Sequence, residues 1–453
     1  MNNRLYCVIE TKKRELDSRI YFAIKASESN WSVVIGKKST LFNNSNLLKQ
    51  GIYLFKSLGP KNYKNIKKVK KYGHKVVALD EEGLTISNSE FVKKRIDENC
   101  LKNIEFFFMW GERQKTINLK VWKSYEKKMI SSGLSRADIL QNSFKNYIKF
   151  EANKIKKKYG DFILLTTKFP KYNYPENLLL KRDGSVYEGL HDKQADIQKK
   201  NLEEFLDFLD IYSKKFHNKK LILRPHPGED VQFWKHAIKK FKNVTLILDD
   251  KSTCYWIMAS KLLISCNCYT SFESYMLGKV SINYSPCDDD VHDYDLIKAV
   301  SYNISSQDKL LSYLENYYKT GEKVEDNNFD YVTADKIMSE YIYNYKKKDS
   351  DEIILKYLNK INLEYDKRKS DLKSNKFYFN YFKIVKKFKN FYHSYLNKNN
   401  PGLVRLLNNK FPSLTLSELD SKIKEIMISL NLVKSDFKID EIYPGVFLIE
   451  KNK

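Results

Sequence analysis

Short apolar segments alternate with amphipathic segments along the first part of the chain. The apolar segments lie at 6–10, 31–36, 51–57, 75–83 and 105–111. The stretches between them, such as RELDSRIYFAIKASES, have the apolar periodicity of helices. Because strands that alternate with helices are typical of a parallel sheet, the pattern predicts an α/β unit that ends near Asp138.

The same alternation returns after a charged helix that we predict at 145–159. Strands are expected within 161–169, 220–227, 244–250, 255–266 and 279–286, and amphipathic helices at 203–217 and 271–278. Two doubly wound units predict a GT-B-like α/β fold, with two Rossmann-like domains facing an interdomain cleft. We expect an acceptor-side domain at 1–143 and a nucleotide-sugar domain at 144–345.

The remaining residues, 346–453, are expected to form a basic, helical C-terminal extension. Within it, 411–431 resembles a capped helix that starts at Thr415 or Ser417, and FLIE near the end could form an edge strand. The segment 372–400 holds seven lysines, nine aromatic residues and no acidic residue. Lysines beside anionic lipid and aromatics at the interface would suit peripheral association with the inner membrane, whereas the alternative is a helix packed on the other domains.

Composition limits the class of protein. A chain of 453 residues with 42% hydrophobic residues is long enough for at least two buried cores. No apolar run is long enough to span a membrane, and MNNRLYCVIE does not resemble a signal peptide. We therefore expect a cytoplasmic protein that is soluble or attached to the cytoplasmic face of the membrane.

The net charge of +25 favours an anionic partner, although richness in Lys, Asn, Ile, Tyr and Phe also fits an AT-rich coding sequence. No nucleic-acid-binding motif accompanies the charge, so we expect no nucleic-acid partner. The six cysteines are scattered, and Cys266-Asn267-Cys268 lacks the second pair that a zinc site needs. Buried reduced thiols and no metal are the expectation.

The stretch LRPHPGED places a histidine at the end of a predicted strand, where ligands bind in open α/β sheets. Pro225 and Pro227 restrict the backbone on both sides of His226. Arg224 could give bidentate hydrogen bonds to a phosphate, and His226 could bind that phosphate or protonate a leaving group. The alternative is a histidine that only caps a turn.

The stretch CNCYTSFESYMLGK places Thr270 and Ser271 at the start of a predicted helix. Hydroxyls and the free N–H groups of a helix start suit a phosphate, and Glu273 could accept hydrogen bonds from ribose hydroxyls. The alternative is an ordinary N-terminal cap.

The stretch LDEEG places Asp80, Glu81 and Glu82 after another predicted strand. One of them could deprotonate a sugar hydroxyl, because clustered carboxylates raise one another's pKa. The alternative is a solvated acidic turn.

A fourth stretch, IETKKRELDSRI, crowds charged residues into the first β-to-α turn. We expect Glu10, Arg14 and Asp17, together with Asp80, to contact substrate. Surface ion pairs along the helix are the alternative for this turn.

The order Glu81-Glu82-Gly83, then His226-Pro227, then Thr270-Ser271 resembles the motifs of bacterial sialyltransferases and polysialyltransferases, which are GT-B glycosyltransferases. A closer likeness is to bacterial surface carbohydrate biosynthesis proteins. It is carried by IETKKRELDSR, GIYLFKS, ALDEEGL, FFFMWG, LRPHPGED, SFESYMLGKVSINYSP and KFPSLTLSEL. The chain departs from that pattern at SGLSRAD, where a GNPR-D stretch is usual, and at Cys266-Asn267-Cys268, where a His-Asn-Gly-like run is usual.

The resemblance implies transfer of a nonulosonic acid (sialic, legionaminic or pseudaminic type) or Kdo from a CMP-activated donor to a surface glycan or lipid-linked glycan. It implies Glu81 as general base with Glu82 in support, His226 at the donor phosphate, Thr270 and Ser271 binding that phosphate, and neither metal nor cofactor. Because a single base is expected, we predict inversion, and retention is left open.

Three alternatives belong to other classes. A GT-B-like sugar-nucleotide epimerase and a glycerophosphate-type wall polymer transferase would use similar domains. A basic protein that binds a membrane surface or nucleic acid would not be an enzyme at all. The choice among Asp80, Glu81 and Glu82 as base rests on motif position alone.

Overall fold

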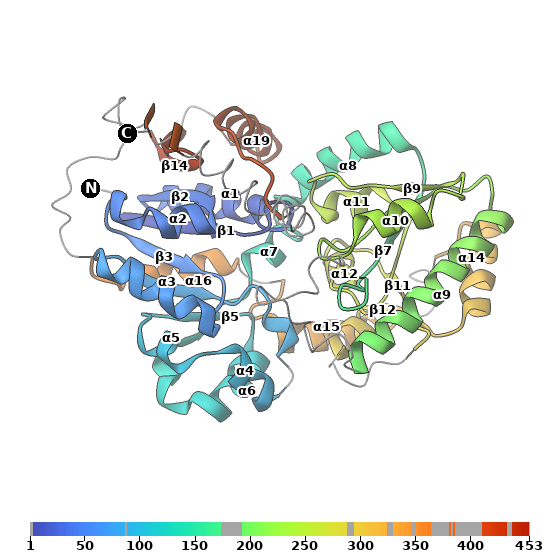
Figure 1. The fold of residues 1–453 in the computed structure, drawn as a ribbon, viewed down its shortest axis with the longest axis horizontal. Coiled ribbons are helices and arrows are strands. Elements are labelled where there is room, and N and C mark those ends of the chain that lie inside the picture. Colours follow the sequence, from blue (N-terminus) through green and yellow to red (C-terminus); the bar gives the residue numbers. More distant parts are fainter. Residues whose placement is uncertain are drawn as a thin grey trace. The chain divides into compact units, whose positions relative to one another are not determined.

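A computed structural model describes residues 3–86, 88–173, 193–287, 294–323, 329–346, 349–363, 380–381, 384–385, 410–432 and 437–452. The described residues divide into two compact units (Figure 1). Unit 1 takes those within 1–147, 338–396 and 411–453, and unit 2 takes those within 148–337 and 397–410.

Unit 1 is built on an eight-stranded sheet with the order β13-β14-β2-β1-β3-β4-β5-β6. Its strands are β1 (Asn3–Ile9), β2 (Trp31–Lys37), β3 (Ile52–Phe55), β4 (Lys75–Leu79), β5 (Phe107–Met109), β6 (Met129–Ser131), β13 (Phe437–Tyr443) and β14 (Val446–Lys451). The strands from β2 to β6 in this order are parallel. The chain reverses its direction of winding between β1 and β3, which is where doubly wound sheets bind ligands at the carboxyl ends of strands.

Helices connect and cover these strands. They are α1 (Lys12–Glu28), α2 (Lys38–Asn43), α3 (Pro60–Lys71), α4 (Ser89–Arg95), α5 (Glu98–Lys102), α6 (Glu112–Trp122), α7 (Ser135–Asp138), α16 (Ser350–Leu358) and α19 (Leu416–Ser429). Short 3-10 turns lie at Ser45–Leu47, Gly83–Thr85 and Lys123–Lys128. The inner strands are continuous apolar runs because they are buried on both faces.

Apart from Lys410, the described residues of the C-terminal segment belong to unit 1. Strand β14 pairs antiparallel with β2 through the register Ile449↔Val33, and β13 pairs with β14. Helix α16 packs on α1 and α7. The expected boundaries after 143 and 345 therefore differ from those observed, which lie after 147 and 337, because pairing with the open edge of β2 draws the C-terminal strands into the first sheet.

A reciprocal set of hydrogen bonds fastens α16 to α7. The Ser350 N–H and hydroxyl donate to Asp138 at 2.7 and 2.5 Å, and the Ser135 hydroxyl donates to Asp351. Asp351 is fully buried and Asp138 is partly buried. Burial raises the pKa of Asp351 to about 7 and also raises the pKa of Asp138, which repulsion from Asp351 raises further.

Unit 2 is built on a six-stranded parallel sheet with the order β12-β11-β10-β7-β8-β9. Its strands are β7 (Ile163–Thr166), β8 (Leu221–Arg224), β9 (Val244–Leu246), β10 (Leu262–Ser265), β11 (Ser281–Tyr284) and β12 (Ser301–Ile304). Its described helices are α9 (Lys193–Lys215), α10 (Val231–Ala237), α11 (Thr253–Ala259), α12 (Thr270–Met276), α13 (Asp295–Ala299) and α14 (Gln307–Thr320). Here the winding reverses between β7 and β10.

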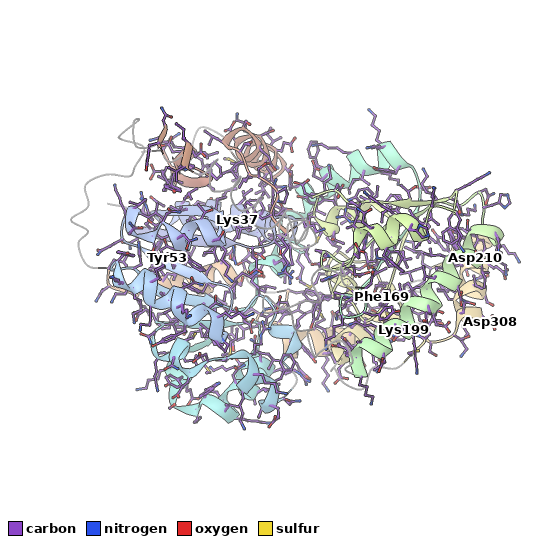
Figure 2. All side chains as sticks on the ribbon, in the orientation of Figure 1. Lys37, Tyr53, Phe169, Lys199, Asp210 and Asp308 are labelled. Atoms are coloured by element: carbon purple, nitrogen blue, oxygen red, sulfur yellow. The ribbon has the colours of Figure 1, made fainter. Side chains whose placement is uncertain are left out.

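Two helices, α8 (Lys145–Tyr159) and α15 (Tyr331–Tyr341), contain two of the points at which the chain passes between units. Each unit has its own apolar core. Tyr53 lies in the core of unit 1 and Phe169 in that of unit 2, whereas Lys199 and Asp308 are exposed on unit 2 (Figure 2).

Most expected elements are confirmed, including the helix at 145–159 and the C-terminal helix, whose cap is the Thr415 hydroxyl bonded to the Glu418 N–H. Strands β6, β12 and β13 were not predicted, because β6 is very short and β12 and β13 have no apolar run. The segment 372–400 lies outside the described residues except for 380–381 and 384–385. Across the described residues, none of the helices is both long and apolar enough to be a membrane-spanning candidate.

Candidate functional site

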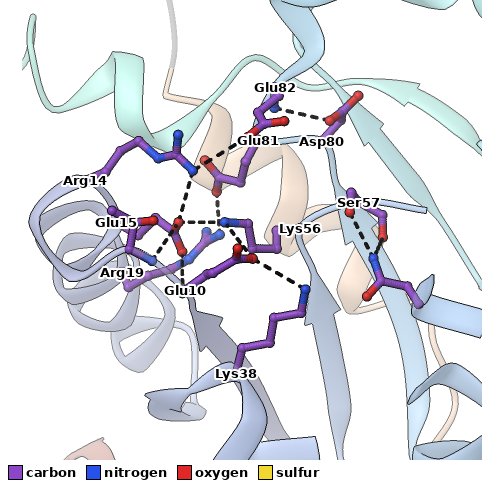
Figure 3. A network of polar contacts seen from close by, with 12 residues as sticks. Glu10, Arg14, Glu15, Arg19, Lys38, Lys56, Ser57, Asp80, Glu81 and Glu82 are labelled. Carbon is purple, nitrogen blue, oxygen red and sulfur yellow. Dashed lines mark hydrogen bonds and ion pairs between the residues drawn. The ribbon is translucent and has the colours of Figure 1, made fainter. Parts of the chain in front are cut away.

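The carboxyl ends of β1, β3 and β4 in unit 1 carry the charged residues of the first candidate site. Glu10 follows β1, Lys56 follows β3, and Asp80 and Glu81 follow β4. Helix α1 begins just after β1 and contributes further charged side chains to the same edge (Figure 3). The structure therefore brings together the acidic stretch LDEEG and the first β-to-α turn, as the sequence predicted for a parallel sheet.

Glu81 is almost fully buried and is held by one cation. The Arg19 guanidinium donates from Nη2 to Glu81 Oε1 at 2.5 Å, and both side chains are at most 2% exposed. The second carboxylate oxygen, Oε2, is buried and has no hydrogen-bond partner among the described residues. A buried carboxylate with one oxygen engaged and the other unsatisfied has the geometry of a fixed proton acceptor.

Asp80, unlike Glu81, has hydrogen-bond partners on several elements of unit 1. Its carboxylate accepts from Arg95 Nη2 at 2.5 Å and from Gln114 Nε2 at 3.0 Å, and its carbonyl accepts from the Trp110 indole. Because these bonds tie β4 to α4 and α6, Asp80 has a structural environment. Contact with substrate, which the sequence suggested for Asp80, has no support in this geometry.

Glu82 is about half exposed and faces Arg95 at 3.2 Å and Arg14 at 3.8 Å. Burial raises the pKa of Glu82, but the charges of Arg95, Arg14 and Lys56 outweigh it and lower the pKa below its ordinary value. The expectation that these carboxylates raise one another's pKa is therefore wrong for Glu82, because Arg95, which Glu82 shares with Asp80, and Arg14 stabilise its charged form.

Gly83 completes this stretch for a steric reason. A Cβ atom at Gly83 would lie 2.5 Å from Oε1 of Gln114, the same side chain whose amide donates to Asp80. The glycine therefore leaves room for the contact that positions the acidic turn.

The first β-to-α turn forms a network of ion pairs (Figure 3). Lys56 Nζ lies 2.7 Å from Glu15 Oε1 and 3.4 Å from Glu10 Oε2, and Lys38 Nζ also lies 3.4 Å from Glu10. Burial raises the pKa of Glu15, but Lys56 and Arg14 outweigh it and lower the pKa to about 2. Glu10 and Arg14 are partly exposed and remain available for the substrate contact that we predicted.

Asp17 contacts the C-terminal helix α19. It forms an ion pair with Lys422 of α19 at 2.9 Å. Burial lowers the pKa of Lys422, but the charge of Asp17 raises it by more, so the net effect is a rise. Asp17 thus fastens the C-terminal helix to α1, so its expected contact with substrate has no support in this geometry. The sequence placed Arg19 among the charged residues of this turn but did not indicate its pairing with Glu81. Lys56 and Arg95 were not selected, although the position of Lys56 after an apolar strand was an available signal.

In unit 2, His226 follows β8 in a fixed orientation. The imidazole Nδ1 accepts a hydrogen bond from the Gly228 backbone N–H at 3.1 Å. The backbone N–H of His226 donates to Glu229 Oε1 at 3.2 Å. A Cβ atom at position 228 would approach His226 Nδ1 to 3.2 Å, so the glycine of RPHPG also has a steric reason. Since Nδ1 is an acceptor here, the proton of the neutral imidazole lies on Nε2.

Glu229 is the residue of this motif that sequence reasoning missed. It is buried and accepts five hydrogen bonds from neighbouring loops, donated by the Thr167 hydroxyl, the Phe169 and His226 N–H groups, the Asn173 amide and the Trp234 indole. Burial raises the pKa of Glu229, and these hydrogen bonds only partly offset it. One carboxyl group therefore joins the loop after β7 to the loop after β8.

Arg224 does not face a ligand position. Its guanidinium is buried, donates to Asp249 Oδ1 at 2.8 Å and to the Lys251 carbonyl at 2.9 Å, and stacks on Trp256. Burial lowers its pKa, and the Asp249 charge opposes that effect. The expected bidentate contact with phosphate is therefore not supported, because the guanidinium is used to hold the loop after β9.

The hydroxyls of Thr270 and Ser271 have different surroundings. The Thr270 hydroxyl lies 2.9 Å from that of Thr166, at the carboxyl ends of β7 and β10, where the winding reverses. The Ser271 hydroxyl is fully buried and lies 2.8 Å from that of Ser265, so it faces the sheet. Glu273 is partly buried within α12. Thr270 thus contacts the end of β7, whereas Ser271 faces the sheet, and phosphate binding by Thr270 stays a prediction.

The Cys266-Asn267-Cys268 stretch places Asn267 in the left-handed backbone region with φ of 44°, which asparagine tolerates. Its N–H donates to Asn283 at 2.8 Å and its amide to Ser285 at 3.0 Å. All six cysteines are free thiols. Within the described ranges, there is no group of three or more His, Cys, Asp or Glu side chains suited to a metal ion.

Two Rossmann-like units with these sheet orders define a GT-B fold. A putative UDP-N-acetylglucosamine 2-epimerase from Listeria monocytogenes is similar, with a TM-score of 0.50 and 10% identity over 82% of this chain and 100% of that chain. This likeness concerns the fold alone.

Two other solved structures give lower TM-scores. A variant of the wall teichoic acid polymerase TagF soaked with CDPG gives 0.49, with 10% identity over 79% of this chain and 88% of that one. The UDP-GlcNAc 2-epimerase of Methanocaldococcus jannaschii with UDP-GlcNAc and UDP gives 0.47, with 13% identity over 79% and 100%. No protein-family model and no curated protein matches the sequence.

Proposed function

We propose that the protein is a glycosyltransferase that uses a nucleotide-activated sugar, with CMP-linked nonulosonic acid or CMP-Kdo as donor. The observation that carries the proposal is the orientation of His226. Its Nδ1 is occupied by the Gly228 N–H, so the Nε2–H is the donor for a phosphate at the carboxyl edge of the sheet. The order of the motifs along the chain supports the CMP-sugar class.

In the proposed reaction, His226 and Thr270 of unit 2 bind the donor phosphate and stabilise the negative charge that grows on it as the bond to the anomeric carbon breaks. The acceptor oxygen forms the new bond to that carbon, and Glu81 is assigned as the base that takes the proton of the acceptor hydroxyl. CMP leaves with the bonding electron pair. One base and one displacement give inversion, and no metal or cofactor is part of the proposal.

The test is nucleotide binding by calorimetry with CMP, CDP, UDP and GDP. The His226→Ala variant is compared with wild type and with His217→Ala, which changes an exposed histidine of the same unit. The proposal expects CMP to bind most tightly, with weaker binding only in His226→Ala. Transfer from CMP-nonulosonic acids and CMP-Kdo is then assayed. Absence of nucleotide binding in the wild type would overturn the proposal.

A second candidate is a sugar-nucleotide epimerase, which the likeness in fold to the Listeria protein favours. Preference for UDP over CMP, and release of a free epimerised sugar, would identify it. Preference for CDP and formation of a glycerophosphate polymer would instead identify a wall polymer transferase.

The acceptor in this proposal is a surface glycan or a lipid-linked glycan on the cytoplasmic face of the membrane. The basic segment 372–400 would provide the peripheral attachment. Salt-sensitive binding to anionic liposomes that disappears when 372–400 is deleted would support this attachment. Equal binding by the deletion variant would exclude it.

A further inference from the structure

We propose that helix α3 of unit 1 binds the surface of a membrane that contains anionic lipids. Six of its 12 residues, PKNYKNIKKVKK, are lysines, and none is acidic. The inference goes beyond the proposed function, because binding to a charged surface needs neither a nucleotide nor a sugar acceptor. It also concerns a part of the chain other than the segment 372–400. The six residues are Lys61, Lys64, Lys67, Lys68, Lys70 and Lys71.

The lysines lie on the solvent face of α3. On the opposite face Asn62, Ile66 and Val69 are buried, and Ile66 and Val69 belong to the apolar core of unit 1. Since positions three or four apart share a face of a helix, this spacing separates the lysines from the core. Five of the six lysines are exposed, and Lys68 is partly exposed.

The lysines of α3 are not paired with acidic side chains. None of the six forms an ion pair with any residue that the structure describes. Lys68 donates to Asn43 Oδ1 and Lys70 donates to Asn103 Oδ1, each at 3.1 Å, and these amides carry no charge. Hydrogen bonds to neutral groups orient two of the lysines but leave the positive charge of the face in place.

The elements packed beside α3 add little negative charge. Helices α2 and α5 and the 3-10 turn Ser45–Leu47 pack beside it (Figure 1). Neither α2 nor the 3-10 turn has an acidic residue. Glu98 of α5 forms an ion pair with Lys102 at 3.5 Å and accepts from the Tyr125 hydroxyl at 2.8 Å. The surface around α3 therefore stays positive.

Other helices arrange their lysines differently, so a lysine-rich composition does not explain α3. Among the described helices of eight or more residues, α3 alone has no acidic residue. Residues four positions apart in α3 include Lys64 with Lys68 and Lys67 with Lys71, and like charges at this spacing repel. Elsewhere an acidic residue stands four positions before a lysine and forms an ion pair with it: Glu98–Lys102, Asp210–Lys214 and Asp420–Lys424.

An anionic membrane offsets this repulsion. Each lysine close to such a surface strengthens binding by roughly fivefold. No large hydrophobic side chain of α3 is exposed, so binding through this face is electrostatic and is weakened by salt. The helix starts after the carboxyl end of β3, at the edge of the sheet that carries Lys56 and Glu81. Contact with a membrane would hold a lipid-linked acceptor near that edge, which favours a membrane over a nucleic acid.

The experiment measures binding to vesicles by flotation, without nucleotide and with 372–400 unchanged in every protein. One vesicle contains equal parts of phosphatidylglycerol and phosphatidylcholine, and the other contains phosphatidylcholine alone. The α3 variant replaces four lysines by Gln, whose helix propensity is similar, and a second variant replaces the same four by Arg. The α3 substitutions are Lys61→Gln, Lys64→Gln, Lys67→Gln and Lys71→Gln. The control changes four exposed lysines of unit 2: Lys199→Gln, Lys200→Gln, Lys235→Gln and Lys239→Gln.

We expect the Gln variant of α3 to bind the anionic vesicles about ten- to a hundredfold more weakly than wild type. The Arg variant and the unit 2 control should bind like wild type, and none of the proteins should bind phosphatidylcholine alone. Equal binding by the Gln variant and the unit 2 control would overturn the proposal. Weaker binding to double-stranded RNA with unchanged binding to vesicles would also overturn it, by assigning α3 to a nucleic acid. CMP affinity should be the same in all four proteins, and its absence in the wild type would overturn the proposed function without changing the result with vesicles.

Discussion

At the carboxyl ends of β1, β3 and β4, unit 1 carries carboxylates that are paired with buried cations. At the carboxyl ends of β7, β8 and β10, unit 2 carries hydroxyls and an imidazole, together with one ion pair, Arg224–Asp249, and one buried carboxyl, Glu229, that gathers hydroxyl, amide, indole and backbone donors. The same type of sheet thus carries a network of ion pairs in one unit and mainly hydrogen bonds to one carboxyl in the other. A network of ion pairs suits the handling of a proton, whereas hydrogen-bond donors suit the binding of a phosphate.

The largest test of this difference is Glu81→Gln. If Glu81 is the base, transfer should fall by about a hundred- to ten-thousandfold while CMP affinity stays the same. Glu15→Gln is the matched control, because Glu15 is equally buried and is also paired with one close cation, Lys56. Comparable losses of transfer in both variants would show that any broken ion pair in unit 1 has this effect.

The second test compares one buried arginine of each unit, Arg19 and Arg224. Arg19→Met leaves Glu81 as an uncompensated buried charge, so we expect it to lower the free energy of unfolding by roughly 3–5 kcal/mol. Arg224→Met leaves Asp249, which is 32% exposed, and should cost only about 1–3 kcal/mol. Urea denaturation of each variant measures both values. An equal cost would mean that the two units do not differ in how they bury charge.

The third test uses pH. Burial raises the pKa of Asp351 from 3.8 to about 7, with Asp349 adding to the rise and Ser135, Arg19 and Lys25 opposing it. The folded protein therefore holds a proton that the unfolded chain has lost. The contribution of this group is greatest below pH 3.8, declines as the pH rises toward about 7, and changes little above it.

Urea denaturation of wild type and Asp351→Asn between pH 5 and 8 measures this decline, with Asp138 as the coupled neighbour. The difference between the two proteins should change by at most about 1.4 kcal/mol per pH unit below pH 7. A difference that does not vary with pH would contradict the assignment.

The smallest effects are expected at the two motif glycines. In Gly228→Ala the added methyl group crowds His226 Nδ1, so CMP affinity should fall by about two- to fivefold with little loss of stability. In Gly83→Ala the methyl group displaces the flexible Gln114 side chain, so transfer should fall by a similar amount and CMP affinity should not change. If Gly83→Ala weakened CMP binding and Gly228→Ala lowered only transfer, the roles proposed for the two units would be reversed.

The alternation of apolar and amphipathic segments was enough to predict two doubly wound sheets and the strand ends that carry His226, Thr270 and Glu81. The pattern could not show which polar side chains face the sheet edge. Arg224 and Ser271 belong to the predicted motifs, but Asp249 and Ser265, which lie outside those motifs or face the sheet, occupy them. Lys56 and Arg95 were missed for the same reason, since their roles depend on contacts made only after folding.

The pairing of β14 with β2 has a consequence for synthesis of the chain. The edge of β2, with Val33 and Ile35 fully buried in the finished sheet, is made early, and its partner is made only after the whole of unit 2. During translation this edge is an open template for other strands, which is a recognised route to aggregation. Unit 2 can complete its sheet while the polypeptide is still growing, whereas unit 1 must wait, so chaperones that shield nascent edges should act mainly on unit 1.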